Sequence, residues 1–236
     1  MDVNNQQKGA ESSERKDRIC QSIRKVGNRL GIEISPEMLD LSVTYIEELL
    51  RWNKAFNLVG RRLDLEGVLL LFLDSLTPLM MKGVFSEGVE VLDIGSGAGM
   101  PGIPLYLIGG PFPLTMAETQ RKRVTFLRHI CRKLGLSRAY VYPGRIEEMR
   151  KHEDYMSFFD VGLARAVMDP MKLLGIAGPL ISEGGKLVLF VGSSDGERLR
   201  RGASGLEKRG WRMESLRSTQ RYVGRDNYLA ILKKTS

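Results

Sequence analysis

The stretch VLDIGSGAGMPGIPLYL, from Val91 to Leu107, decides the fold of this chain. Its first residues, 91–94, form a short apolar run that is typical of a buried strand, and its last residues favour a helix. Between them lies a turn with four glycines, Gly95, Gly97, Gly99 and Gly102. Glycine permits backbone conformations and close approaches that a side chain would prevent. A strand, a glycine-rich turn and a helix in this order predict a ligand-binding turn.

The spacing of the glycines distinguishes between a dinucleotide, a nucleoside triphosphate and a ligand without phosphate. A dinucleotide turn beginning at Gly95 would need another glycine where Met100 stands. A triphosphate turn would end in lysine followed by serine or threonine, and this pair is absent. The pattern present is D-x-G-x-G-x-G, beginning at Asp93. A carboxylate facing the ligand there would repel an anion and attract an ammonium group, which favours S-adenosylmethionine.

A second acidic residue, Glu118, ends the next predicted strand. An acid at this place in doubly wound folds binds the ribose hydroxyls of an adenosine ligand. Asp93 and Glu118 are 25 residues apart, about the length of one strand–helix–strand unit. Each acid alone could be a solvated residue at the end of a strand, but together with the glycine turn they predict a methyl-donor site.

Apolar strands and amphipathic helices alternate from residue 89 to residue 192. The predicted strands cover residues 89–94, 114–118, 139–144, 159–167 and 184–192. The predicted helices cover residues 102–109, 121–136 and 170–181. This alternation predicts an α/β fold with a mostly parallel, doubly wound, Rossmann-like sheet. Two more strands, 210–218 and 226–234, have no strong helix between them and predict an antiparallel pair at the end of the sheet.

The remaining sequence divides into two parts. Residues 1–17 are polar and predict a disordered N-terminal arm, whereas residues 18–85 repeat apolar side chains at helical spacing. Ser35 followed by Pro36 is typical of a helix start within this helical section. Its longest apolar run contains Asp74, Pro78 and Lys82, which favours a buried helix over a membrane span. The catalytic domain is then expected over residues 86–236.

Composition limits the classes of site and partner. Two distant cysteines and two histidines among 236 residues offer neither a disulfide framework nor a metal cluster, so we expect no metal and a cytoplasmic location. The net charge of +8 makes a polyanion such as RNA a plausible partner.

Two basic segments could contact the phosphates of RNA. The first contains Arg121, Lys122, Arg123, Arg128, Arg132 and Lys133. The second contains Arg198, Arg200, Arg201, Lys208, Arg209 and Arg212. For each residue the alternative is an ordinary solvated helix face. We expect contacts from Arg121, Lys122, Arg123, Arg200 and Arg201, and also from Arg225 before the last strand.

Several motifs together resemble the GidB family, also called RsmG, over most of the chain from about residue 30. LDIGSGAGMPGIPL is similar to the family's turn and is the most specific motif because of PGIPL. RWNKAFNLVG, FLDSL, RKRVTFLR, GRIEE and ARAV are similar to its other conserved stretches. These bacterial enzymes methylate N7 of a guanine in 16S ribosomal RNA with S-adenosylmethionine, on a class I methyltransferase fold. The resemblance implies that reaction here, on ribosomal RNA or the small subunit. We also expect a monomer, although no residue pattern specifies the oligomeric state.

The resemblance also implies which residues form the site. Donor-binding residues are expected at Asp93, Gly95, Ser96, Gly97, Gly99, Met100, Glu118, Thr119, Ile146, Glu147 and Arg165. Arg145 and Arg165 are expected to position the reactants, and the alternative for each is a surface arginine paired with a carboxylate. The chain departs from the family at Leu70, Leu71, Val191 and Asn227, where basic residues are usual, so RNA docking is expected to be arranged differently.

Guanine N7 has a free lone pair, so a methyltransferase of this kind needs alignment of the reactants rather than a general base. The Asn-Pro-Pro-Tyr motif of enzymes that methylate amino nitrogens is absent. The helical spacing of Cys131 favours a core residue over a nucleophile. Trp52 could stack on a base, but its apolar context at the end of a helix favours the core. Two other functions stay open: methylation of a protein or small metabolite, and RNA binding without catalysis.

Overall fold

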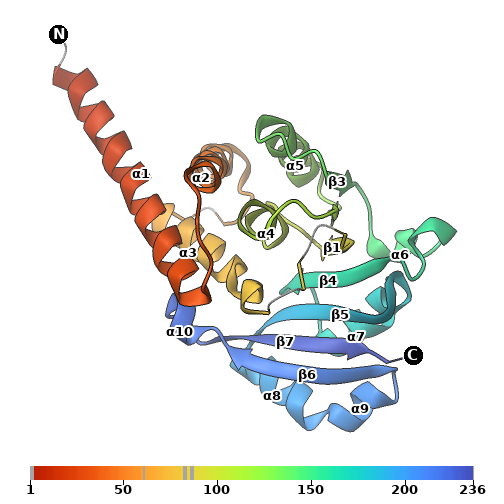
Figure 1. The fold of residues 1–236 in the computed structure, drawn as a ribbon. Helices are drawn as coiled ribbons and strands as arrows, with labels where there is room; N and C mark the ends of the chain where they lie inside the picture. The colour runs from red at the N-terminus through yellow and green to blue at the C-terminus, as the bar shows by residue number, and fades with distance from the viewer. Residues whose placement is uncertain (1–2, 61, 82–83, 86–87, 236) are drawn as a thin grey trace.

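A seven-stranded sheet with helices on both faces forms the centre of the molecule (Figure 1). The computed structural model describes residues 3–60, 62–81, 84–85 and 88–235. The strand order is β3-β2-β1-β4-β5-β7-β6. The strands are β1 Val91–Ile94, β2 Leu114–Ala117, β3 Ala139–Tyr142, β4 Phe159–Arg165, β5 Ile181–Gly192, β6 Trp211–Ser218 and β7 Asn227–Lys234. The first five are parallel, and β7 pairs antiparallel with both β5 and β6, which confirms the predicted sheet.

The helices fall into two groups, one on each face of the sheet (Figure 1). On one face lie α1 Val3–Leu30, α2 Pro36–Phe56, α3 Leu65–Ser75, α4 Gly102–Gly109 and α5 Arg121–Lys133. On the other lie α6 Ile146–Met149, α7 Pro170–Ala177, α8 Ser193–Arg201 and α9 Ala203–Glu207. Short helical turns complete the chain at η1 Thr77–Met80, η2 Glu153–Tyr155, η3 Gly178–Leu180 and α10 Gln220–Val223. None of the helices in the described ranges is long and apolar enough to cross a membrane.

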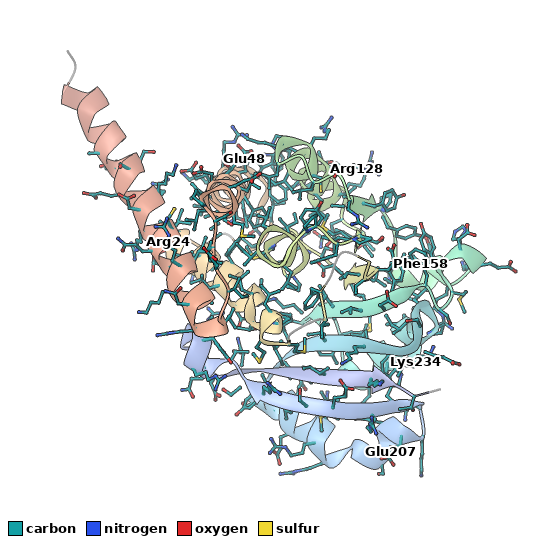
Figure 2. The ribbon with its side chains drawn as sticks, viewed as in Figure 1. Arg24, Glu48, Arg128, Phe158, Glu207 and Lys234 are labelled. Atoms are coloured by element: carbon teal, nitrogen blue, oxygen red, sulfur yellow. The ribbon has the colours of Figure 1, made fainter. Side chains whose placement is uncertain are left out.

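Each face of the sheet has its own apolar core, and successive residues of a strand alternate between the two. Val91 belongs to the core beneath α1–α5, whereas Leu92 belongs to the core beneath α6–α9. The first core is the larger one, and side chains fill the space between the N-terminal helices and the sheet (Figure 2). The N-terminal helices therefore cover the same sheet face as α4 and α5.

The helix start predicted at Ser35 is confirmed. The Ser35 hydroxyl accepts a hydrogen bond from the Met38 N–H at 3.2 Å, and Pro36 occupies the first helical position. The helix ends at Phe56, where the next residue, Asn57, takes the left-handed conformation with φ of 53°. The side chain of Asn53 then holds the segment that follows the helix. Its Oδ1 accepts a hydrogen bond from the Val59 N–H, and its Nδ2 donates one to the Gly60 carbonyl.

The beginning of the chain differs from the arm expected for residues 1–17. A single helix, α1, runs from Val3 to Leu30, and its first half projects from the body of the molecule (Figure 1). Residues 1 and 2 of the expected arm lie outside the described residues. Residues 10–18 of α1 are exposed and Ile19 is buried, so the polar composition of that part reflects an exposed helix rather than absence of a helix.

Two helices in the second basic segment, α8 and α9, are absent from the expected elements. Their apolar side chains are sparse, and Leu199 and Leu206 are the buried ones that join the second core. Two apolar positions do not produce a readable helical period in a segment dominated by charge.

Candidate functional site

The glycine turn connects β1 to α4 and is held by a dense set of backbone hydrogen bonds. The Ser96 carbonyl accepts hydrogen bonds from the N–H groups of Gly99, at 2.7 Å, and Met100, at 3.1 Å. The Ser96 hydroxyl donates to the Asp93 carbonyl at 2.9 Å. Gly95, Gly97 and Gly99 have φ of 65°, 59° and 94°, a region that favours glycine. The predicted glycines are therefore required by the conformation of the turn itself.

The glycines differ in what a side chain would meet. A Cβ on Gly99 would lie 2.4 Å from the Ile103 side chain, so Gly99 serves the packing of the turn against α4. A Cβ on Gly97 would meet no protein atom closer than the Gly95 carbonyl oxygen at 3.9 Å. The turn is thus closed on the side of Gly99 and open at Gly97, where a ligand could approach the backbone.

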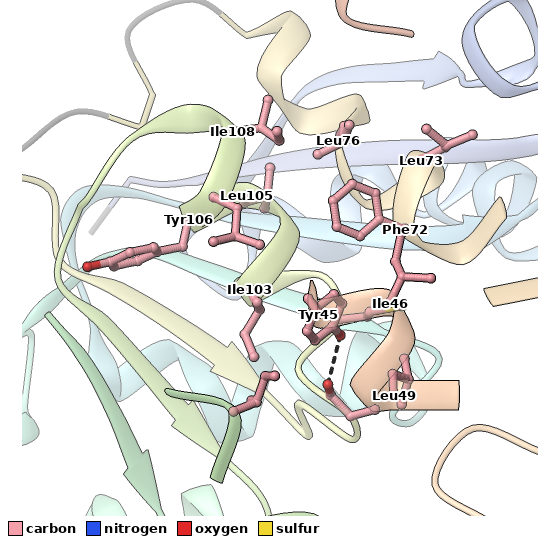
Figure 3. Packing of buried hydrophobic residues seen from close by; sticks show 14 of the residues in the cluster. Tyr45, Ile46, Leu49, Phe72, Leu73, Leu76, Ile103, Leu105, Tyr106 and Ile108 are labelled. Carbon is pink, nitrogen blue, oxygen red and sulfur yellow. Dashed lines mark hydrogen bonds between the residues drawn. The ribbon is translucent and has the colours of Figure 1, made fainter. Parts of the chain in front are cut away.

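Tyr45 of α2 braces this turn from the N-terminal section. Its hydroxyl donates a hydrogen bond to the Ala98 carbonyl at 2.8 Å, and its ring is fully buried (Figure 3). Burial raises the pKa of the Tyr45 hydroxyl well above its ordinary value, so the group remains a donor. Phe72 packs beside the Tyr45 ring, with the two ring centres 6.0 Å apart. The position of the turn therefore depends on α2 and α3 as well as on the sheet.

Two adjoining cavities open at the carboxyl ends of the parallel strands. The larger, which we call the turn cavity, has a volume of about 510 Å³. The smaller, the strand-end cavity, has a volume of about 240 Å³. Both are lined by Gly95, Glu118, Thr119 and Val167. This is the edge at which open α/β sheets bind ligands.

Most of the predicted donor-binding residues line these cavities. The turn cavity is lined by Gly95, Ser96, Gly97, Met100, Glu118, Thr119 and Arg165. The strand-end cavity is lined by Ile146 and Glu147, and also by Arg145. Asp93 and Gly99 line neither cavity. Arg145 and Arg165, which were each expected to position the reactants, line different cavities.

Glu118 links the turn to the start of α5. One carboxylate oxygen accepts the Gly97 N–H at 2.9 Å, and the other accepts the N–H groups of Thr119 and Gln120 at 2.8 Å each. The side chain is almost fully buried between these amides. A carboxylate offers about four acceptor positions, so Glu118 can still accept a hydrogen bond from a ligand hydroxyl.

Asp93 does not face the ligand space, in contrast to the prediction. It is fully buried, and one oxygen accepts the Gly102 N–H at 3.0 Å. The other oxygen has no hydrogen-bond partner within the described part of the chain. Burial raises the pKa of Asp93 to about 7, although the Gly102 N–H opposes this. Asp93 points to the α4 face of the sheet, so it supports the start of α4 beneath the turn.

Arg165 is half-buried at the end of β4. Its Nη1 donates to Asp74 Oδ2 at 2.6 Å and its Nη2 donates to Ser75 Oγ at 3.0 Å. The guanidinium also stacks on the Phe190 ring, 4.0 Å from the ring centre. Burial lowers the pKa of Arg165, opposed by Asp74, which is itself fully buried. Of the alternative for Arg165, a surface arginine paired with a carboxylate, the structure shows the carboxylate partner but not the surface position, and the pair borders the turn cavity.

The predicted RNA-binding residues fall into different environments. Arg121 and Lys122 are exposed at the start of α5, and Arg225 is half-buried near Arg165, whose pKa it lowers. Arg123 instead turns inward, donating to the Leu58 carbonyl at 3.2 Å and lying 3.8 Å from Glu118.

Arg200 and Arg201 both contact Glu197 on their own helix, at 3.8 and 3.1 Å. Their charges are therefore partly compensated already. Trp52 packs against the rings of Phe126 and His129 at the first core, as its apolar context at the helix end predicted.

Sequence reasoning missed several residues that line the turn cavity: Leu58, Val59, Gln120, Ala166 and Val167. Ala166 has φ of 49°, which is uncommon outside glycine and collects at functional sites. In the sequence, a role for Ala166 was indicated only by its place next to Arg165 in the ARAV motif. Leu71, identified as a departure from the family, also lines the cavity and makes that wall apolar.

The geometry fits a nucleoside with an amino-acid tail. The open side of the turn at Gly97 allows close backbone approach, and Glu118 lies where the two cavities join. No group of three or more potential metal ligands occurs among the residues that the structure describes.

Comparison with known protein families gives one match that covers most of the chain. Residues 38–223 match the GidB family, described as rRNA small subunit methyltransferase G. A protein named ribosomal RNA small subunit methyltransferase G from Oenococcus oeni is 35% identical over 163 residues, covering 69% of this chain and 67% of its own. The protein of the same name from Lactobacillus delbrueckii subsp. bulgaricus is 34% identical, covering 78% and 77%.

Solved structures with much lower identity share the fold. Aeropyrum pernix fibrillarin with natively bound S-adenosyl-L-methionine has a TM-score of 0.54 at 15% identity, covering 67% of this chain and 72% of its own. A mutant of MtNAS in complex with S-adenosylmethionine has a TM-score of 0.55 at 17% identity, covering 92% and 98%. The fold is thus that of class I methyltransferases.

Proposed function

Because this chain belongs to the rRNA small subunit methyltransferase G family, we propose that it transfers a methyl group from S-adenosylmethionine to N7 of a guanine in 16S ribosomal RNA. The observation that carries the proposal is the pair of cavities around the glycine turn, with Gly97 open to the larger one. Residues 86–236 form the catalytic domain in this proposal, and the N-terminal section completes the wall of its site.

The chain's own residues would bind the donor from two sides. Gly95, Ser96, Gly97 and Met100 line the turn cavity, and Ile146 and Glu147 line the strand-end cavity, where the adenine would lie. Glu118 and Thr119 border both cavities and would contact the ribose between them. When bound, S-adenosylmethionine supplies a methyl group that its sulfonium has already activated. The protein then has to align this group with the acceptor and exclude water.

The site has the groups expected for a reaction without a general base. Among the described residues, Glu118 is the one carboxylate that lines the turn cavity, and its oxygens accept hydrogen bonds from three backbone amides. Arg165 is tied to Asp74, so it positions the cavity wall rather than moving a proton. Guanine N7 offers a lone pair without deprotonation, which matches these groups better than an amino nitrogen does. Arg145, exposed beside the strand-end cavity, would hold a phosphate of the RNA.

The RNA would approach over exposed and half-buried cations near the turn cavity. We assign the first contacts to Arg121, Lys122 and Arg225, and none to Arg123, which has partners within the protein. We expect weaker RNA contacts from Arg200 and Arg201, because Glu197 contacts both side chains. A ribosomal substrate would place the protein in the cytoplasm, where we propose that it acts as a monomer.

Labelled S-adenosylmethionine tests the reaction. Small ribosomal subunits from cells lacking this protein should accept one methyl group, and mass mapping of the digested RNA should find 7-methylguanosine. Label appearing in protein or in a small metabolite would support a different methyltransferase, and donor binding without any transfer would support a non-catalytic module.

A glycine variant tests the placement of the donor. Gly97→Val should abolish donor binding in calorimetry, because its side chain would extend into the turn cavity. Gly135→Val is the matched control, since Gly135 also has a positive φ, of 64°, has nothing within 4 Å of its Cβ and lines neither cavity. Equal donor affinity in the two variants would contradict the placement.

A further inference from the structure

Phe56 is a large apolar side chain that the fold leaves exposed. It is the last residue of α2, and its exposed fraction is 42%. The ring of Trp52, one helical turn earlier, packs against it with the two ring centres 5.3 Å apart. Trp52 in turn contacts the rings of Phe126 and His129 at the first core. These rings form a row that runs from the core to the surface, and Phe56 is its exposed end.

The end of α2 lies beside the start of α5, next to the turn cavity. The Arg123 Nε donates a hydrogen bond to the Leu58 carbonyl at 3.2 Å, which ties the two segments together. Leu58 and Gln120 both line the cavity. Phe56 precedes Leu58 by two residues, so their Cα atoms are at most about 7 Å apart. A nucleotide next to the one in the cavity could therefore reach the Phe56 ring.

Cations without carboxylate partners accompany this ring. The Lys122 Nζ lies 5.9 Å from the centre of the Phe56 ring. Lys122 and its neighbour Arg121 are exposed, and within the described part of the chain neither side chain has an ion pair. The α5 sequence contains no acidic residue. A cation–π contact at an exposed site is weak, so the ammonium group can leave the ring for a phosphate.

We propose that Phe56 stacks on a base of single-stranded ribosomal RNA next to the methylated guanine, with the adjoining phosphates at Lys122 and Arg121. This inference rests on the proposed function and adds a contact for the nucleotide beside the target. A base that enters an active site leaves the stack of its neighbours, and the Phe56 ring would replace it there. Exposed rings beside cations hold single strands in this way, because every base has a π-face and every nucleotide a phosphate.

Phe158 offers a matched control at the other end of the sheet. Its exposed fraction, 43%, is nearly that of Phe56, and it also packs on a neighbouring ring, that of Phe159 at 5.1 Å. Phe158 directly precedes β4, whose last residue, Arg165, lines the turn cavity. A strand of seven residues spans about 20 Å, so Phe158 lies far from the candidate site.

Full-length variants test the stacking contact with three probes. These are small ribosomal subunits from cells lacking this protein, a twelve-nucleotide oligouridylate, and a ribose-phosphate chain of the same length without bases. Phe56→Ala should weaken binding of the subunits and the oligouridylate roughly tenfold, without changing the salt dependence. Binding of the base-free chain should stay unchanged, and Phe56→Tyr and Phe158→Ala should bind all three probes like wild type.

Lys122→Ala should act differently, because it removes a charge rather than a ring. It should flatten the plot of log affinity against log salt by about 0.7 units, as expected for one phosphate of a single strand. An unchanged slope would overturn the phosphate contact. Donor affinity in calorimetry should be equal for Phe56→Ala and wild type, since Phe56 lines neither cavity. A lower donor affinity would assign the effect to the cavity wall and overturn the stacking contact.

The inference is also overturned if Phe56→Ala and Phe158→Ala lose the same affinity, or if Phe56→Tyr binds as weakly as Phe56→Ala. An equal loss for the base-free chain would show that the ring does not contact a base. A loss confined to intact subunits would identify a protein contact, and either result contradicts the proposal. Failure of the proposed function is distinguishable, because the wild-type protein would then transfer no methyl group to small-subunit RNA, whatever the result for Phe56.

Discussion

Arg165 and Asp74 are 91 residues apart in the sequence and form an ion pair at the edge of the turn cavity, with Asp74 fully buried and Arg165 half-buried. Removing one partner of such a pair leaves the other as an uncompensated charge, which is strongly destabilising. The pair therefore combines two duties: it joins α3 to β4, and it fixes one wall of the candidate active site. Arg145 is exposed, so it borders the candidate active site without joining two elements of the fold.

Changing each of the two arginines to alanine should have different effects on stability and on methylation. Arg165→Ala should lower the free energy of unfolding by about 3–5 kcal/mol, because Asp74 stays buried without its partner. Arg145→Ala should change it by less than about 0.5 kcal/mol while lowering methylation clearly. Denaturant unfolding and single-turnover methylation check both variants. Equal stability losses would show that Arg145 has a structural partner after all.

Asp93 should make stability depend on pH in an unusual direction. Its folded pKa of about 7 lies above the ordinary value of 3.8, so the folded state binds the proton more tightly than the unfolded chain does. Stability should therefore be greatest below about pH 4 for this group and should fall as pH rises toward 7, by at most on the order of 4 kcal/mol.

Asp93→Asn removes this titration while it keeps an oxygen for the Gly102 N–H. The variant should fold, and its melting temperature should change less than that of the wild type between pH 4 and pH 7. Thermal scans at unit intervals of pH measure this difference. Parallel curves for the two proteins would assign the titration to another group.

At the scale of the elements, α2 positions the glycine turn through Tyr45. Tyr45→Phe keeps the ring in the core and removes the hydrogen bond to the Ala98 carbonyl. The free energy of unfolding should fall by about 1–2 kcal/mol, because a buried carbonyl loses its donor. Donor affinity should fall as well, since the turn loses a fixed point. Tyr106→Phe is a suitable control, because the Tyr106 hydroxyl contacts Arg138 N at 3.4 Å, away from the turn.

Elements whose residues repeat at a fixed period could be predicted from the sequence, and elements that depend on distant contacts could not. The five parallel strands, the antiparallel pair and the helix start at Ser35 follow from local pattern and turn chemistry. The α1 helix before Ile19 and the α8 helix have few buried apolar residues, so their patterns carry little information.

The candidate site shows the same division. The glycines were readable because their conformations require glycine locally. The inward direction of Asp93 was not readable, because the sequence does not say which face of β1 meets α4. The partners of Arg165 and Arg123 come from α3 and from the segment after α2, at separations of 91 and 65 residues, which no local pattern encodes.

At the scale of the whole molecule, the first half of α1 lies outside the shared core. A chain lacking residues 1–15 should lose helical circular dichroism but melt within about 2 °C of the full chain, because exposed contacts contribute little. A chain lacking residues 1–35 should be strongly destabilised, since Ile19, Ile23 and Val26 belong to the first core. A large loss in the shorter deletion would contradict this assignment of the core.

The first core also limits how this chain can be divided. Ile46 of α2, Phe72 of α3 and Leu105 of α4 belong to one continuous cluster (Figure 3). A fragment that began at residue 86 would keep every strand and most of the residues that line the candidate site. It would also expose the apolar side of α4, and such a surface promotes self-association. The sequence pattern changes near residue 85, but this position is not a domain boundary at which the chain can be cut or grafted. The catalytic part can be transferred to another protein only together with the N-terminal helices that cover its sheet.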